Sequence, residues 1–144
     1  MKILVGVDDS KYSADLTRAI VTERRADNTE VLVLHVLQPI GPAPPQMDQG
    51  YAPELEAERE AAKALVERVA TELRSAGFKV KTLVGVGDVR EGIIDSAAEW
   101  HADLIMVGSH GLRGIQRFLL GGVSEFVVRH APCSVEIVRT PAKP

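Results

Sequence analysis

The chain contains a single cysteine, Cys133, among its 144 residues. One cysteine forms neither an intramolecular disulfide nor a C-x-x-C metal or redox motif, which favours the reducing cytoplasm. No apolar stretch approaches the roughly 18 residues of a membrane span, and the run from Ile3 to Val7 is shorter than the hydrophobic region of a signal peptide. We therefore expect a soluble cytoplasmic protein without a membrane partner.

Aromatic residues are also scarce, and neither sign of charge dominates. Aromatics make up 4% of the chain, and 17 basic against 20 acidic residues give a formal net charge of −3. The longest basic tract is Arg24-Arg25. Single-strand binders need stacking platforms and duplex binders need a basic surface, so these scarcities exclude nucleic acid as a partner.

Short apolar runs alternate with segments of helical period, and the length and composition fit one domain over residues 1–144. Three runs rich in β-branched residues are too short for helices and predict strands buried on both faces: 3–7, 31–37 and 104–107. Two weaker strands are predicted over 78–86 and 133–138. The last alternates in polarity, as an edge strand does.

Helices are predicted over about 11–26, 53–76, 88–100 and 121–130. Asp88 is expected to cap the third helix, and Val123, Val127 and Val128 of the fourth are expected to face the core. The strand–helix alternation predicts an α/β, Rossmann-like fold, in which an open parallel sheet carries helices on both faces. Residues 38–50 hold four of the eight prolines and predict a loop within this domain.

Glycines gather between the fourth predicted strand and the last helix. Residues 108–124 hold five glycines together with Arg113 and Arg117. Such a segment lets backbone amides approach an anion, which the positive end of the following helix also attracts. The same glycines also fit a tight turn that binds nothing. No P-loop or dinucleotide fingerprint is present, and Gly85 and Gly87 are predicted to be turn residues.

The spacing of Gly108, Gly111 and Gly121 resembles the ATP-binding motif of the universal stress protein family. Further similarities run through the whole chain: the opening Ile3 to Ser10, the strand end Leu34-His35-Val36, the run Ala102 to Gly111, and residues 119–133. The resemblance implies a five-stranded sheet in the order 3-2-1-4-5. It also implies a homodimer through the fifth strand and a bound adenine nucleotide, ATP or else AMP or ADP, that brings its own Mg²⁺.

The resemblance also implies which residues contact the ligand. Asp8 and Val36 would hold the adenosine end, with Val7 and Val107 beside it. The ribose and phosphates would lie against Gly108, Gly111, Gly121, Gly122, Val123 and Ser124. Arg113 offers positive charge, while His110 fits either a phosphate donor or a turn residue facing solvent.

Gly122 departs from the family pattern, because ATP-binding members usually carry serine or threonine at that position. The backbone amide is kept, and Ser124 offers a hydroxyl nearby. A hydroxyl hydrogen bond contributes only about 0.5 to 1.5 kcal/mol, so we expect weakened binding rather than none.

Three functions are consistent with these residues. The first is a nucleotide-responsive regulatory module of the stress response; the second is a dimeric interaction protein of the same fold with an empty pocket. The third, a slow ATPase or autokinase, lacks an evident base and a Walker lysine. Any ATP hydrolysis should therefore be very slow. No cluster of histidine, cysteine and acidic residues has metal-ligand spacing, so we expect no metal bound by the protein alone.

Overall fold

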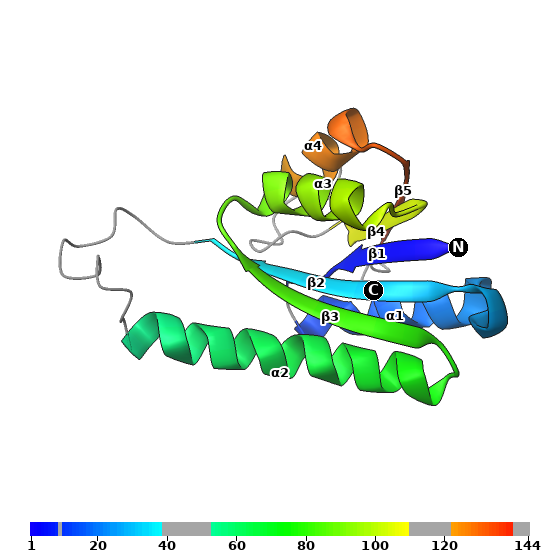
Figure 1. Cartoon of the computed structure of the whole chain (residues 1–144), viewed down its shortest axis with the longest axis horizontal. Helices are drawn as coiled ribbons and strands as arrows, with labels where there is room; N and C mark the ends of the chain where they lie inside the picture. Colours follow the sequence, from blue (N-terminus) through cyan, green and yellow to red (C-terminus); the bar gives the residue numbers. More distant parts are fainter. Residues whose placement is uncertain (9, 39–52, 110–121, 140–144) are drawn as a thin grey trace, which may run out of the picture.

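A computed structural model describes residues 1–8, 10–38, 53–109 and 122–139. Strands and helices alternate along the chain, with one additional 3₁₀ turn, η1 (Figure 1). The elements are β1 (Lys2–Gly6), α1 (Ser10–Glu23), η1 (Ala26–Asn28), β2 (Glu30–Leu37), α2 (Pro53–Ser75), β3 (Lys79–Val86), α3 (Val89–Trp100), β4 (Leu104–Gly108), α4 (Gly122–His130) and β5 (Ser134–Val138). The predicted alternation is confirmed, although η1 was not predicted. The predicted proline-rich loop lies outside the described residues, apart from Gln38.

The five strands form one parallel sheet in the order β3-β2-β1-β4-β5, as the resemblance implies. Gly6 at the end of β1 pairs with Leu34 of β2 on one side and with Val107 of β4 on the other. The carboxyl ends of these three strands therefore meet at one edge of the sheet. The order reverses between β1 and β4, which is where open α/β sheets bind ligands.

Helices cover both faces of the sheet, and alternate residues of each strand point to opposite faces. Figure 1 shows α1 and α2 on one side and α3 and α4 on the other. Ile3 and Val5 of β1 pack in the cluster that contains residues of α1 and α2. Leu4, between them, packs in the cluster that contains residues of α3 and α4. This double cover explains the continuous apolarity of the central strands.

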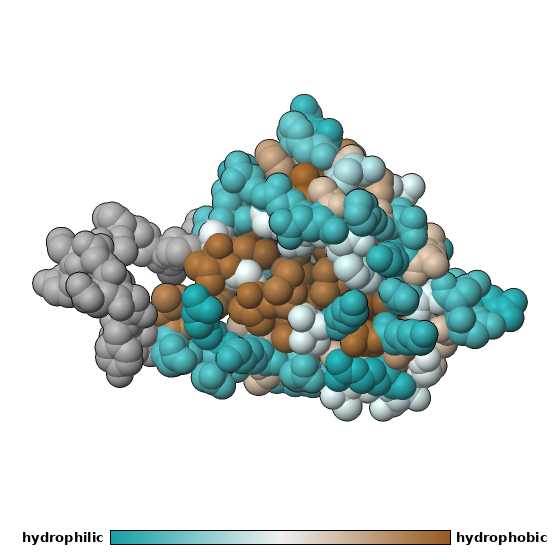
Figure 2. Space-filling view, in the orientation of Figure 1, coloured by the Kyte–Doolittle hydropathy of each residue, from teal (hydrophilic) through white to brown (hydrophobic). Residues whose placement is uncertain are grey.

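The edge strand β3 is less well covered. Figure 2 shows apolar side chains gathered over β3, between α2 and α3. Leu83 and Val86 of this strand are 44% and 45% exposed. The prediction for Gly85 is wrong, because this glycine pairs with Val36 inside the sheet rather than lying in a turn. Gly87, with φ of +140°, does occupy the turn before α3.

The prediction for Val128 in α4 is also wrong, because this side chain is 50% exposed. Ser124 and Val127 are buried on the same helix, three residues apart. Their stripe already faces the sheet, and the next residue, Val128, lies about 100° further around the helix. The apolar pattern alone did not distinguish the two neighbouring valines.

Candidate functional site

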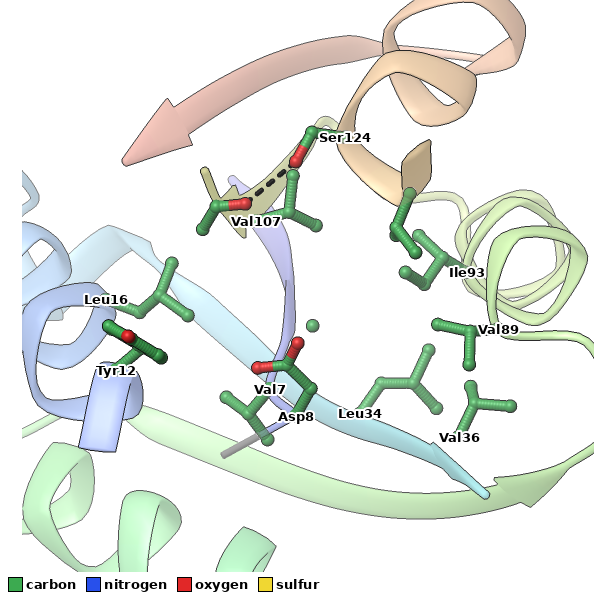
Figure 3. Close-up of a pocket in the computed structure, with 13 residues that line it drawn as sticks. Val7, Asp8, Tyr12, Leu16, Leu34, Val36, Val89, Ile93, Val107 and Ser124 are labelled. Carbon is green, nitrogen blue, oxygen red and sulfur yellow. Dashed lines mark hydrogen bonds between the residues drawn. The ribbon is translucent and has the colours of Figure 1, made fainter. Parts of the chain in front are cut away.

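A pocket lies at the carboxyl edge of the sheet, between the ends of β1, β2 and β4 (Figure 3). Residues of α1, α3 and α4 close it from the sides. Its lining consists of Gly6, Val7, Asp8, Tyr12, Leu16, Leu34, Val36, Val89, Ile93, Val107, Gly108, Val123 and Ser124. The pocket therefore occupies the point of the sheet where the strand order reverses.

One end of the pocket is an apolar slot. Its walls are Leu34 and Val36 from β2 and Val89 and Ile93 from α3, and Figure 3 shows these four side chains grouped together. Leu34 and Ile93 are almost fully buried, with exposed fractions of 1% and 3%. Aliphatic walls of this kind suit the flat faces of a heterocyclic ring.

Asp8 follows β1, and its carboxylate points toward the middle of the pocket in Figure 3. The preceding residue, Val7, is held to β2 by two contacts. Its N–H donates to the Leu34 carbonyl at 2.9 Å, and its own carbonyl lies 2.6 Å from Nδ1 of the buried His35. Because a carbonyl oxygen only accepts, Nδ1 carries the hydrogen and donates this bond, which fixes where the chain leaves the sheet.

The opposite side of the pocket is formed by the end of β4 and the start of α4. The Ser124 hydroxyl donates to the carbonyl of Gly108 at 2.8 Å (dashed in Figure 3). Ser124 is only 2% exposed. Its single hydrogen is thus used within the chain, and only its lone pairs remain for a ligand. The expectation that this hydroxyl offsets the one missing at Gly122 is corrected accordingly.

Gly122 begins α4. An ideal Cβ built on it meets no atom of the described residues within 4 Å, and its φ is not in the left-handed region. None of the described residues therefore requires position 122 to be a glycine for steric reasons.

Seven of the predicted contact residues line this one pocket: Val7, Asp8, Val36, Val107, Gly108, Val123 and Ser124. Gly122 directly precedes two of them on α4. The predicted contacts His110, Gly111, Arg113 and Gly121 lie outside the described residues. Sequence reasoning did not name the α3 residues of the slot, although the cap at Asp88 places the start of α3 at this same edge.

Three described ionisable groups outside the pocket have shifted pKa values, and the first is Glu23, whose pKa is raised by a hydrogen bond with Glu136 and by the negative charge of that residue. A hydrogen bond from the Arg90 side chain and one from the Glu91 backbone lower the pKa of Asp88, the N-cap of α3. Burial raises the pKa of the Cys133 thiol, and the nearby negative charge of Asp103 adds to this effect. The protonated Cys133 packs beside the α3–α4 cluster, as expected for a structural cysteine.

The described residues, 1–8, 10–38, 53–109 and 122–139, hold neither a membrane-spanning helix nor a metal-binding cluster. No helix there is long and apolar enough to cross a membrane. Within the same ranges, no group of three or more histidine, cysteine, aspartate and glutamate side chains is placed to hold a metal ion.

Comparison with known proteins supplies the family. The model of the universal stress protein family matches residues 1–139. The chain belongs to the universal stress protein family. A curated member from Synechocystis is 27% identical over 150 residues, which cover 96% of this chain and 97% of the relative.

Solved structures of the family share the fold. UspA from Lactobacillus plantarum is 30% identical with a TM-score of 0.78, covering 96% of this chain and 97% of that one. A family member from Arabidopsis thaliana with AMP bound is 23% identical with a TM-score of 0.74, covering 99% and 93%. Two other universal stress proteins of similar fold were solved with cAMP and, from Archaeoglobus fulgidus, with dAMP.

Proposed function

We propose that this universal stress protein binds an adenine nucleotide, ATP by preference, in the pocket between β1 and β4, and acts as a nucleotide-responsive module in the stress response. The observation that carries the proposal is the pocket itself. It combines an aliphatic slot, a carboxylate at Asp8, and the end of β4 beside the first residues of α4, at a topological switch point. The family members solved with AMP, cAMP and dAMP support an adenine nucleotide as its ligand.

The pocket residues suit the parts of such a ligand. The base would lie in the slot beside Val36 and Val89, and the Asp8 carboxylate would accept hydrogen bonds from ribose hydroxyls or the exocyclic amine. The phosphates would lie beyond Gly108, against the first amides of α4. Mg²⁺ would enter with the nucleotide, because phosphate oxygens and water are its usual ligands.

The residues around this site favour binding over turnover. Tight phosphate contacts and a positioned base are what phosphoryl transfer needs, and no described side chain of the pocket is a histidine, lysine or arginine. We therefore propose that ATP hydrolysis is much slower than the roughly 1 per second of an ordinary enzyme.

A dimeric interaction protein with an empty pocket is the second candidate. Two observations favour it: Gly122 lacks a hydroxyl, and the Ser124 hydroxyl already donates to Gly108. In either case we propose that two copies pair through β5, which is an edge strand of the sheet. Glu136 of β5 is paired at 2.9 Å with Arg24, the residue directly after α1, so its carboxylate does not stand unpaired at that edge.

The experiment that separates the two candidates is calorimetric titration with ATP, ADP and AMP in Mg²⁺. Asp8→Ala should weaken all three nucleotides by a similar factor, because each carries the same adenosine. Asp95→Ala is the matched control, since Asp95 is an exposed carboxylate on α3 and does not line the pocket. Equal affinities for the wild type and Asp8→Ala would place the nucleotide elsewhere, and no binding at all would favour the empty-pocket candidate.

A further inference from the structure

Val36, in the wall of the slot, packs against two glycines. Gly85 pairs with it from the neighbouring strand β3. Gly92 faces it from α3, four residues after the N-cap Asp88. Val36 is only 7% exposed, so its branched side chain fills the space between strand and helix.

The two glycines differ in how much room they leave. An ideal Cβ on Gly85 would lie 3.9 Å from Cγ2 of Val36, which is an ordinary van der Waals contact. An ideal Cβ on Gly92 would lie 3.0 Å from the same atom and 3.3 Å from Cγ1. Both methyl groups of Val36 therefore use the space that a side chain at position 92 would need.

The start of α3 has little freedom to move away from Val36. Asp88 caps it by accepting from the N–H groups of Arg90 and Glu91 at 2.9 and 3.2 Å. The turn before it is tied to β2 because the Gly87 N–H donates to the Leu37 carbonyl at 2.8 Å. A side chain at position 92 would consequently displace Val36 rather than the helix.

We propose that Gly92 is a positioning residue of the pocket, because its missing side chain lets Val36 pack against α3 and so sets the width of the slot. This inference rests on the proposed nucleotide binding and deepens it by assigning control of the base-accepting end to a residue outside the lining. Gly92 touches no ligand itself; it acts through Val36. A methyl group at position 92 pushes Val36 sideways, and the β-branched side chain has few rotamers with which to adapt.

The test is calorimetric titration of ATP with Mg²⁺ into the wild type, Gly92→Ala, Gly85→Ala, Val36→Ala and the double variant Val36→Ala with Gly92→Ala. Overpacking of this kind should make Gly92→Ala bind roughly tenfold more weakly than the wild type. Gly85→Ala is the matched control, since it adds the same methyl group beside the same valine, and its affinity should stay within about twofold. With Val36 truncated, adding Gly92→Ala should change affinity by less than about twofold.

Thermal unfolding of the same variants reports the contact independently of the ligand. Alanine normally stabilises a helix relative to glycine, so Gly92→Ala should raise the melting temperature only in the Val36→Ala background. Equal ATP affinity for Gly92→Ala and the wild type would overturn the inference alone. The inference is also overturned if Gly92→Ala still lowers the affinity for ATP in the Val36→Ala background. No binding by the wild type would instead remove the proposed function, and this inference with it.

Discussion

The Ser124 hydroxyl and the Gly108 carbonyl, 2.8 Å apart, join the start of α4 to the end of β4. The two residues are separated by sixteen positions of sequence, and both line the pocket. This bond holds the amide end of α4 at the rim of the site. The serine therefore contributes to the shape of the pocket rather than offering a free donor.

Removing this hydroxyl should destabilise the fold. Ser124→Ala removes the partner of the part-buried Gly108 carbonyl, and the loss of such a hydrogen bond costs about 0.5 to 1.5 kcal/mol. Urea unfolding should show this loss, whereas Ser134→Ala, at an exposed position of β5, should change the free energy of unfolding little. Equal stability of the two variants would mean that water replaces the bond.

Restoring the family residue at position 122 should tighten nucleotide binding. Gly122→Ser adds a hydroxyl at the first turn of α4, where a Cβ meets no described residue within 4 Å, and one such hydrogen bond corresponds to about 0.5 to 1.5 kcal/mol, or a few-fold in affinity for ATP. Gly122→Ala is the control, because it adds the Cβ without the hydroxyl. If both variants bind ATP alike, the hydroxyl plays no part.

Asp88 should make stability depend on pH in acid. Its folded pKa is lowered from 3.8 by the hydrogen bonds from Arg90 and Glu91. The stabilisation is therefore present above the unfolded pKa of 3.8 and is lost as pH falls through the lower folded value. Asp88→Asn keeps a capping oxygen without the charge. Urea midpoints measured from neutral pH into acid should fall less steeply for Asp88→Asn than for the wild type. Asp95→Asn, exposed on the same helix, should follow the wild type.

The proposed dimer depends on how Glu136 is paired. Arg24→Ala leaves this carboxylate without its 2.9 Å partner beside the edge strand, and burying an unpaired charge at an interface is costly. Sedimentation at micromolar concentration should show a wild-type dimer that Arg24→Ala shifts toward monomer. Arg25→Ala should sediment like the wild type, since the Arg25–Asp27 pair is exposed on both sides. A strictly monomeric wild type contradicts the dimer.

The sequence predicted the architecture well because its signals are local. Continuous apolarity marked the central strands, and Asp88 marked a helix start that the structure confirms. Local signals do not show which side chains of a helix face the sheet. That Val128 points outward depends on the direction in which α4 crosses the sheet, which periodicity alone leaves open.

The part of the site that local motifs mark was predicted, and the part that depends on packing was not. Asp8, Val36 and Gly108 follow or end strands, so a family motif places them at one edge. The close approach of Gly92 to Val36 joins residues 56 positions apart, and no local pattern encodes it. Likewise, only the packed structure shows that the Ser124 hydroxyl is already engaged.

The most direct test of nucleotide binding is calorimetric titration of the wild-type protein with ATP in excess Mg²⁺, up to millimolar nucleotide. We expect saturable binding of one ATP per chain, weakened by Asp8→Ala and unaffected by Asp95→Ala. Heats no larger than dilution throughout that range would contradict it, and would identify this chain as a family member whose pocket holds no nucleotide.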